Sequence, residues 1–177
     1  IPAAPSQSSD VLLKDESFNQ DPELNKSFCY LLNDIIVAAF AAGVSRIGTW
    51  RQKIRFTGPE RITDWHGNVG HEGYGSNTAQ QWTLMYNQGT FEHVFVDLAA
   101  KMDQVPMPDG STLLDNSLVA FLQEAGQVTH QSGIANLPVI TAGGAGGFFK
   151  TGNYVDFTNK DVQFDDLDEL IAQNPKI

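Results

Sequence analysis

Apolar side chains recur at helical spacing in two stretches of the chain. The first begins at Asp21-Pro22-Glu23, where an aspartate that can cap a helix precedes a proline suited to the first helical position. Its apolar positions are Phe28, Leu31, Leu32, Ile35, Ile36 and Ala39. Gly43 is a typical helix terminator. The second stretch predicts a helix from about Ala79 to Met102. Its apolar face consists of Phe91, Val94, Phe95, Leu98 and Met102.

Shorter apolar segments predict strands. Val44–Trp50 is rich in residues that favour strands, whereas Leu118–Leu122 and Leu137–Thr141 are continuous apolar runs. Such runs are typical of strands buried on both faces of a parallel sheet. Together with the helices they predict an α/β fold of three layers, in which helices flank a mostly parallel central sheet. The intervening Arg51–Thr78 shows no sustained period beyond a short strand near Ile54–Phe56, so we expect a long loop there, of the kind that is usually functional or disordered.

The domain organisation follows from length and local composition. Residues 1–20 are polar and carry two prolines, so we expect an extended N-terminal arm. The chain of 177 residues is long enough for one domain with a sizeable core, and we expect residues 21–177 to be the C-terminal part of an α/β domain. Asp165 or Asp166 is expected to cap a closing helix. Because the chain begins with Ile1 rather than Met, we expect processing or truncation to have removed what came before.

Charge and cysteine content exclude several classes of function. The chain has 11 basic and 21 acidic residues, a net charge of −10, and no cluster of Lys and Arg that would bind a phosphate backbone. We therefore expect no nucleic-acid partner. The longest apolar run, Ile35–Val44, is about half of a membrane span, so none is predicted. Cys29 is the single cysteine, which excludes an intrachain disulfide and a thiolate zinc site, and we expect it to be a small buried hydrophobe.

Polar segments follow the predicted strands and carry most of the histidines. If the strands are parallel, these segments project from one edge of the sheet, where ligands collect. The candidate metal ligands there are Asp64, His66, His71, Glu124 and His130. Imidazoles with carboxylates suit a divalent ion such as zinc, manganese, iron or calcium, which would act as a Lewis acid or activate water. The alternative is that these residues only hydrogen-bond the long connection.

Two further features carry weaker chemical signals. Gly143–Gly147 does not fit the dinucleotide motif GxGxxG, because Phe149 stands where the third glycine belongs. We expect a tight turn there, in which backbone approaches backbone or a ligand, and in which amides could hold an anion. His93 points away from the apolar face of its helix and is expected at the surface or in a second layer.

Three sequence blocks and one isolated residue are distinctive together: DIIVAAFAAGVSRIGTW, DGSTLLDNSLVAFLQEAG, LPVITAGGAGGFFKTG and His130. From about Asp34 to Asn153 the chain resembles the C-terminal half of the HxxSHH family. These are bacterial domains of unknown function, related to sulfatase-like exported proteins of the alkaline phosphatase superfamily. His66 and His71 fit the first and last histidines of the motif, but Val69 and Gly70 replace its Ser and His.

Other positions match the sulfatase-like relatives. The segment from Asp64 to Asn68 looks like their W-D-x-H-x-N segment. Glu124 falls where they carry a Ser-Glu pair, with Gln123 in place of the Ser, and His130 matches the lone His before their Leu-Pro-Val strand. The resemblance implies part of an alkaline phosphatase-like fold, a divalent-metal site, and export to the periplasm or cell surface. It also implies that a nucleophile and further ligands come from an N-terminal half or from another chain.

Two functions remain open at this point. The first is an exported, metal-binding, hydrolase-like domain or subunit of the phosphatase or sulfatase kind, with its catalytic residues and substrate unidentified. The second is a non-catalytic binding or structural subunit of a larger exported assembly, which the replacements at Val69, Gly70 and Gln123 favour. A redox role has little support, because one cysteine excludes an iron–sulfur cluster held by this chain alone.

Overall fold

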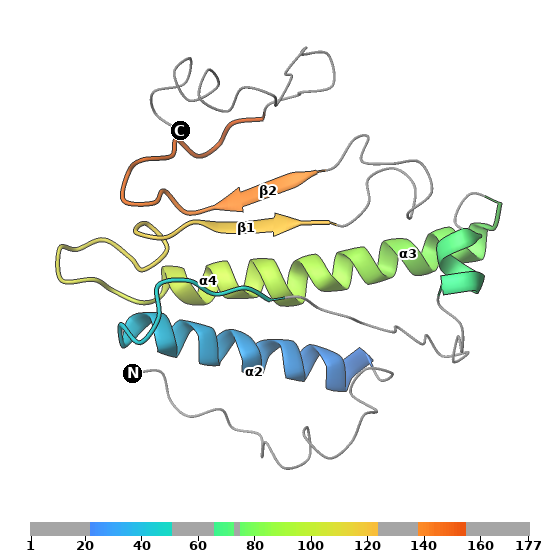
Figure 1. Ribbon diagram of the computed structural model, residues 1–177, viewed down its shortest axis with the longest axis horizontal. Helices are drawn as coiled ribbons and strands as arrows, with labels where there is room; N and C mark the ends of the chain where they lie inside the picture. Colours follow the sequence, from blue (N-terminus) through green and yellow to red (C-terminus); the bar gives the residue numbers. More distant parts are fainter. Residues whose placement is uncertain (1–21, 51–65, 73–74, 124–137, 155–177) are drawn as a thin grey trace.

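Two helical rods lie side by side, and a small sheet runs along the second rod (Figure 1). The computed structural model describes residues 22–50, 66–72, 75–123 and 138–154. The first rod is helix α2 (Pro22–Ala41). The second rod is α3 (Asn77–Thr90), the π-helical turn η3 (Phe91–Val96) and α4 (Asp97–Asp103). A further π-helical turn, η2 (His66–His71), packs on α3. Strands β1 (Val119–Leu122) and β2 (Val139–Ala142) form the sheet.

The predicted first helix is confirmed, but its buried face is not centred where the apolar pattern placed it. α2 ends at Ala41, and Gly43 follows with a φ of +67°, as expected of a terminator. The fully buried positions recur every four residues at Asn25, Cys29, Asn33 and Val37. Ile35, on the predicted face, is 53% exposed. The pattern missed this row because two of its members are asparagines, and at Asn33 the opposite helix supplies hydrogen-bond partners.

The predicted second helix is confirmed over Asn77–Asp103, although the π-helical turn within it was not predicted. Ser76 caps its start, since the Ser76 Oγ accepts a hydrogen bond from the backbone N–H of Ala79 at 3.3 Å. The predicted apolar face is also confirmed, and it packs on two parts of the molecule: strand β1, and the core shared with α2 and Leu113. Phe91 and Phe95 stack on each other and meet Phe121 of β1 at centroid distances of 5.5 and 5.8 Å.

The C-terminal part of the same face forms the main core. Met102 is fully buried and packs with Val37 of α2 and with Leu113. Leu113 comes from the segment after α4, which folds back through a turn at Asp109-Gly110. A second, smaller core joins η2 to α3. Its members are Val69, Ala79 and Trp82.

The predicted strand at Val44–Trp50 is wrong. These residues form a turn and an irregular segment, in which Val44 and Ile47 are 79% and 82% exposed. The Ser45 hydroxyl donates to the Ile47 carbonyl at 2.7 Å and accepts from the Ile47 N–H at 3.3 Å. Short polar side chains that bond the local backbone compete with strand pairing, which explains the difference.

The two apolar runs do form strands, but their predicted parallel arrangement is wrong. β1 and β2 pair antiparallel, with Val119 opposite Ala142 and Leu122 opposite Val139. The prediction that both faces of these strands are buried is also wrong. Partly buried and exposed residues alternate along β1, and most of β2 is exposed. A composition rich in apolar residues does not encode strand direction, which the path of the connection decides. The described residues contain these two strands, so the three-layer, mostly parallel sheet stays a prediction.

Several other predictions fall wholly or partly outside the described residues. The N-terminal arm and the closing helix at Asp165 or Asp166 lie outside them. So does the short strand near Ile54–Phe56. Within the predicted loop Arg51–Thr78, residues 66–71 form a π-helical turn and residues 77–78 begin α3, so the loop prediction is wrong for these residues. Between them, Glu72, Gly75 and Ser76 form a hydrogen-bonded turn.

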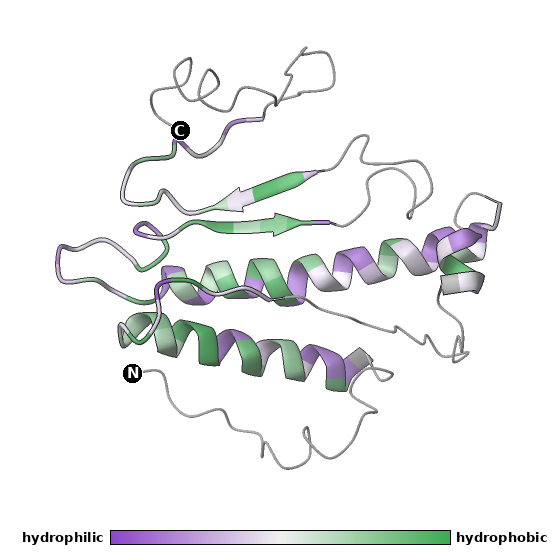
Figure 2. Ribbon diagram, viewed as in Figure 1, coloured by the Kyte–Doolittle hydropathy of each residue, from purple (hydrophilic) through white to green (hydrophobic). Residues whose placement is uncertain are grey.

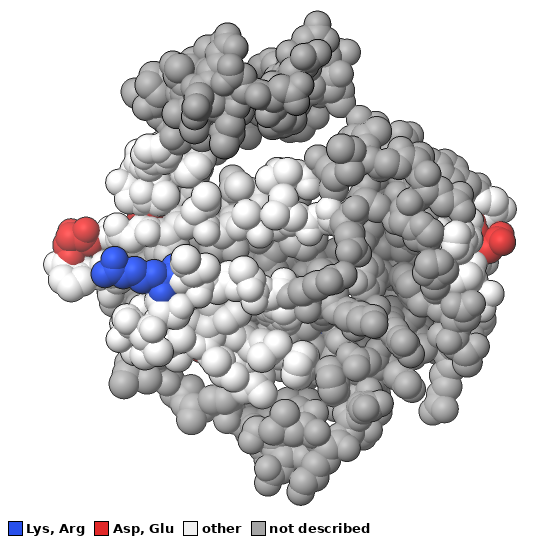
Figure 3. Space-filling model, viewed as in Figure 1, with Lys and Arg blue, Asp and Glu red and all other residues white. Residues whose placement is uncertain are grey.

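Hydropathy and charge are distributed unevenly over the described part. Figure 2 shows apolar residues concentrated in the strands and in the C-terminal part of α2. By length and composition alone, Glu23–Ala41 within α2 is apolar enough to cross a membrane. In the described structure 22% of this stretch is buried, and its contacts to the second rod include the Asn33–Asp97 hydrogen bond. On the face drawn in Figure 3, charged side chains of the described residues lie mainly towards the two ends.

Candidate functional site

The π-helical turn η2 carries two of the five predicted metal ligands. His66 is its first residue and His71, whose side chain is exposed, is its last. Hydrogen bonds in a π-helix join residues five positions apart. Positions 66 and 71 are therefore one turn apart, on the same side of the turn. The turn thus brings the backbone of positions 66 and 71 onto one side of the segment.

Packing fixes this turn against α3. Val69 is 1% exposed and contacts Ala79 and Trp82. After the turn, the Glu72 carbonyl accepts hydrogen bonds from the N–H groups of Gly75 and Ser76, both at 3.0 Å. These contacts lead directly into the capped start of α3. The turn is therefore held by one apolar anchor and by the cap of the next helix.

The other predicted ligands, Asp64, Glu124 and His130, lie outside the described residues. Across the described ranges, no group of three or more His, Cys, Asp and Glu side chains is arranged to hold a metal ion. The predicted convergence of all five ligands therefore stays a prediction.

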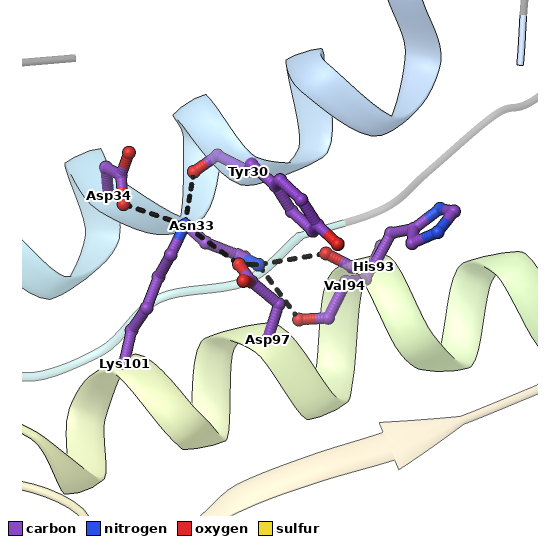
Figure 4. Close-up of polar contacts among 7 residues, drawn as sticks. All are labelled: Tyr30, Asn33, Asp34, His93, Val94, Asp97 and Lys101. Carbon is purple, nitrogen blue, oxygen red and sulfur yellow. Dashed lines mark hydrogen bonds and ion pairs between the residues drawn. The ribbon is translucent and has the colours of Figure 1, made fainter. Parts of the chain in front are cut away.

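A second polar site, which the sequence analysis did not predict, lies between α2 and the η3–α4 segment (Figure 4). We call it the interhelix polar cluster; its members are Tyr30, Asn33, Asp34, His93, Val94, Asp97 and Lys101. At its centre, the Lys101 Nζ lies 2.7 Å from the Asp34 Oδ1 and 2.9 Å from the Asp97 Oδ2. It also donates to the Tyr30 carbonyl at 3.0 Å. The ammonium is thus surrounded by three oxygen acceptors from both helices.

Asn33 is the second connection in the cluster. Its side chain is fully buried, and its Nδ2 donates to the Asp97 Oδ2 at 2.7 Å. The same Nδ2 lies 3.0 Å from the His93 carbonyl oxygen and 3.2 Å from that of Val94. Both carbonyls belong to the π-helical turn η3. The Oδ1 of Asn33 is buried without a hydrogen-bond partner among the described residues.

The pKa shifts in the cluster follow from these contacts. Burial by itself lowers the pKa of Lys101, but hydrogen bonds to the Asp34 and Asp97 carboxylates outweigh it, so the pKa is raised overall. His93 shows the opposite result. Burial lowers its pKa, and the nearby charge of Lys26 lowers it further. Its ring stands edge-on to Tyr30, at a centroid distance of 5.8 Å.

These shifts decide what the cluster can do chemically. A lysine with a raised pKa and two carboxylate partners stays protonated, so it is neither a nucleophile nor a general base at neutral pH. The contacts of the interhelix polar cluster join α2 to η3 and α4. Two sequence signals point to it in retrospect: the i,i+4 pair Asp97 and Lys101, and the polar Asn33-Asp34 step within an apolar helix.

In the glycine run Gly143–Gly147 the backbone packs against backbone, which is one of the two arrangements predicted for it. The N–H groups of Ala145 and Gly146 donate to the carbonyls of Ser117 and Asp115, at 3.0 and 2.8 Å. Those of residues 147–149 donate to carbonyls within the run itself. The expectation that these amides hold an anion is therefore wrong for residues 145–149, because carbonyl oxygens already occupy them.

Two single-residue predictions are also resolved. Cys29 is 1% exposed, and its Sγ donates to the Asn25 Oδ1 at 3.6 Å, which confirms the interpretation as a small buried side chain. His93 is partly buried against α2, so it lies in a second layer.

Comparisons with family models, with curated proteins and with solved structures gave no match. The resemblance to the HxxSHH family is therefore still a prediction, and function has to be argued from the residues and the geometry of η2.

Proposed function

We propose that this chain is a divalent-metal-binding, hydrolase-like domain. In this proposal the ion is held by His66 and His71 of η2 together with Asp64, Glu124 and His130. The observation that supports it best is the placement of positions 66 and 71 one π-turn apart. Two histidines one turn apart on a helix are a recurring metal-binding arrangement, because both imidazoles reach the same ion.

The ligand chemistry limits the kind of reaction. A divalent ion held by imidazoles and carboxylates would supply Lewis acidity and an activated water. The role of this chain would be to fix the ligands: Val69 holds the turn on α3, and Ser76 holds the start of the next helix. We propose phosphate or sulfate esters as the substrate class and an exported location, in line with the resemblance of the sequence. The attacking group would come from a partner chain or from a preceding half of the domain.

Metal analysis of the purified protein tests this proposal. We expect about one ion per chain after dialysis against zinc or manganese, and a loss of affinity of at least about tenfold in His66→Ala, His71→Ala and His130→Ala. His93→Ala is the matched control, since His93 lies in the interhelix polar cluster, and it should keep the ion. Stoichiometric metal that survives both His66→Ala and His130→Ala would overturn the assignment.

A non-catalytic binding or structural subunit is the second candidate. It is favoured by apolar side chains exposed on the small sheet, among them Leu122 at 65% and Val139 at 60%. Exposed apolar patches commonly mark interfaces. Turnover of generic phosphate or sulfate esters that a chelator abolishes would exclude this second candidate. Bound metal without turnover, in a preparation that contains the partner chain, would favour it.

A further inference from the structure

The π-helical turn η3 changes the hydrogen bonds of the second rod at one point. In a regular α-helix the N–H of Asp97 would bond to the carbonyl of His93. Here it donates to the carbonyls of Glu92 and Val94 instead. The His93 carbonyl accepts the Nδ2 of Asn33, 60 residues away in the sequence, at 3.0 Å. The Asn33 side chain of α2 therefore donates to the carbonyl that the Asp97 N–H would bond in a regular helix.

The side chain of Asn33 is held next to η3 by burial and by hydrogen bonds. It is 0% exposed, in the middle of the buried row of α2. Its Nδ2 reaches Asp97 as well as η3, and the same Asp97 Oδ2 also contacts Lys101. The turn is thus tied to α2 by the Asn33 amide. The Asp97 oxygen that accepts this amide also pairs with Lys101, and Lys101 in turn pairs with Asp34 of α2. An apolar side chain at position 33 would leave the His93 carbonyl without this buried donor, and a regular α-helix would then be the better-paired state.

The register of η3 affects how η2 is oriented relative to α2. A π turn contains about one residue more than an α turn, so residues before and after it are rotated by about 100° relative to their places in a regular helix. The residues before η3 carry η2, through the contacts of Val69 with Ala79 and Trp82. The residues after η3 are fixed on α2, through Lys101 and Asp34. The turn therefore sets the rotation of the His66–His71 turn relative to α2.

We propose that Asn33 and η3 form a register lock. Asn33 keeps the π turn in place, and removing its amide converts η3 to regular α-helix and rotates η2 away from its present orientation. Asn33 is a positioning residue here and not a catalytic one. The lock itself follows from the contacts of α2 and η3; only its effect on metal binding rests on the function proposed above.

The test is to replace Asn33 and to observe which carbonyl the Asp97 amide bonds. In the wild type, NMR couplings across hydrogen bonds should connect the Asp97 nitrogen to the Glu92 carbonyl carbon. In Asn33→Leu they should connect it to the His93 carbonyl carbon. Asn25→Leu is the matched control, because Asn25 is a buried asparagine two turns away in the same row, and it should keep the Glu92 coupling.

A Glu92 coupling that persists in Asn33→Leu would overturn the lock. If that variant does not fold, Asn33→Ser is tested in its place, because serine keeps one hydrogen-bond donor. Two sets of NMR resonances for residues 91–98, one for each register, would support the lock. A single set of resonances identical to the wild type would contradict it. Zinc titration provides the separate readout. We expect Asn33→Leu to bind zinc at least tenfold more weakly than Asn25→Leu. If the wild type binds no metal, the proposed function fails, while the couplings still test the lock.

Discussion

Gly143 shows how one residue can fix the relation between two segments. Its φ is +91°, a region that side chains other than glycine rarely adopt. A Cβ placed on it would lie 2.6 Å from the Leu114 carbonyl oxygen, and closer still to that of Ser117. The strand β2 can leave the sheet and pass over the turn after Leu113 only because position 143 has no side chain.

We therefore predict that Gly143→Ala destabilises the protein by about 2–4 kcal/mol, from the combination of backbone strain and a clash with fixed carbonyls. Gly147→Ala is the control, because Gly147 has a similar φ of +88° but open space around its Cβ position, and it should cost about 1 kcal/mol. Urea denaturation of the two variants measures the difference. Equal losses would mean that the close approach to residues 114–117 contributes nothing.

Asn33 is the other residue whose role depends on its partner. From the sequence it is one polar position in an apolar helix, and its position predicts no particular contact. The role appears only when the carbonyls of η3 are placed against it. A side chain buried between two helices gains or loses free energy according to the groups it meets, and no local pattern encodes those groups.

At the scale of elements, the helices were predictable and their faces were predictable in part. The face at Phe91 and Met102 follows the apolar pattern, because that face packs on other apolar residues. The face of α2 follows it only in part: Val37 packs on Met102, whereas Asn33 meets carbonyl and carboxylate oxygens of the second rod. Pairing direction was not predictable for the strands, since β1 and β2 contain no signal for the path between them.

The Lys101–Asp34 ion pair is one of the contacts that join α2 to α4. Replacing Lys101 with Met would leave the carboxylates of Asp34 and Asp97 facing each other without a cation. We expect a loss of about 1–3 kcal/mol in the free energy of unfolding, below the value for fully buried pairs because the side chains are partly exposed. Asp34→Asn leaves one carboxylate partner and should cost less than about 1 kcal/mol.

Urea denaturation shows which of the two variants, Lys101→Met or Asp34→Asn, loses more free energy of unfolding, and we expect the larger loss in Lys101→Met. If Asp34→Asn were as damaging as Lys101→Met, repulsion between the carboxylates would not be the cause. The pKa of Lys101 is raised in the folded protein, so this contribution is present below the ordinary lysine pKa. It is lost as the pH rises through the raised folded value.

At the scale of the whole molecule, His93 makes stability depend on pH at the junction of the two rods. Burial lowers its pKa below 6.5 in the folded state, so the unfolded chain binds a proton more readily. Its contribution to stability is therefore present above pH 6.5 and is lost as the pH falls through the folded pKa. The surrounding charged groups are Lys26 and Glu23 on α2 and Glu92 and Asp97 on the second rod.

We predict that the free energy of unfolding falls more between pH 7.5 and 5.5 in the wild type than in His93→Gln. Comparing the two proteins removes the effect of carboxylates that titrate in both. Urea denaturation at the two pH values gives the difference directly. Identical changes in wild type and variant would show that His93 is as accessible to protons in the folded state as in the unfolded chain.

The amino-acid sequence by itself determined the two long helices, the burial of Cys29 and the positions of both strands. These features depend on interactions between residues close along the chain, or on apolar character alone. Only the tertiary structure decided the antiparallel pairing of β1 with β2, the burial of Asn33, and the π-helical turn that it holds. Each of these depends on groups from distant segments, because hydrogen-bond partners and strand neighbours are chosen when those segments meet.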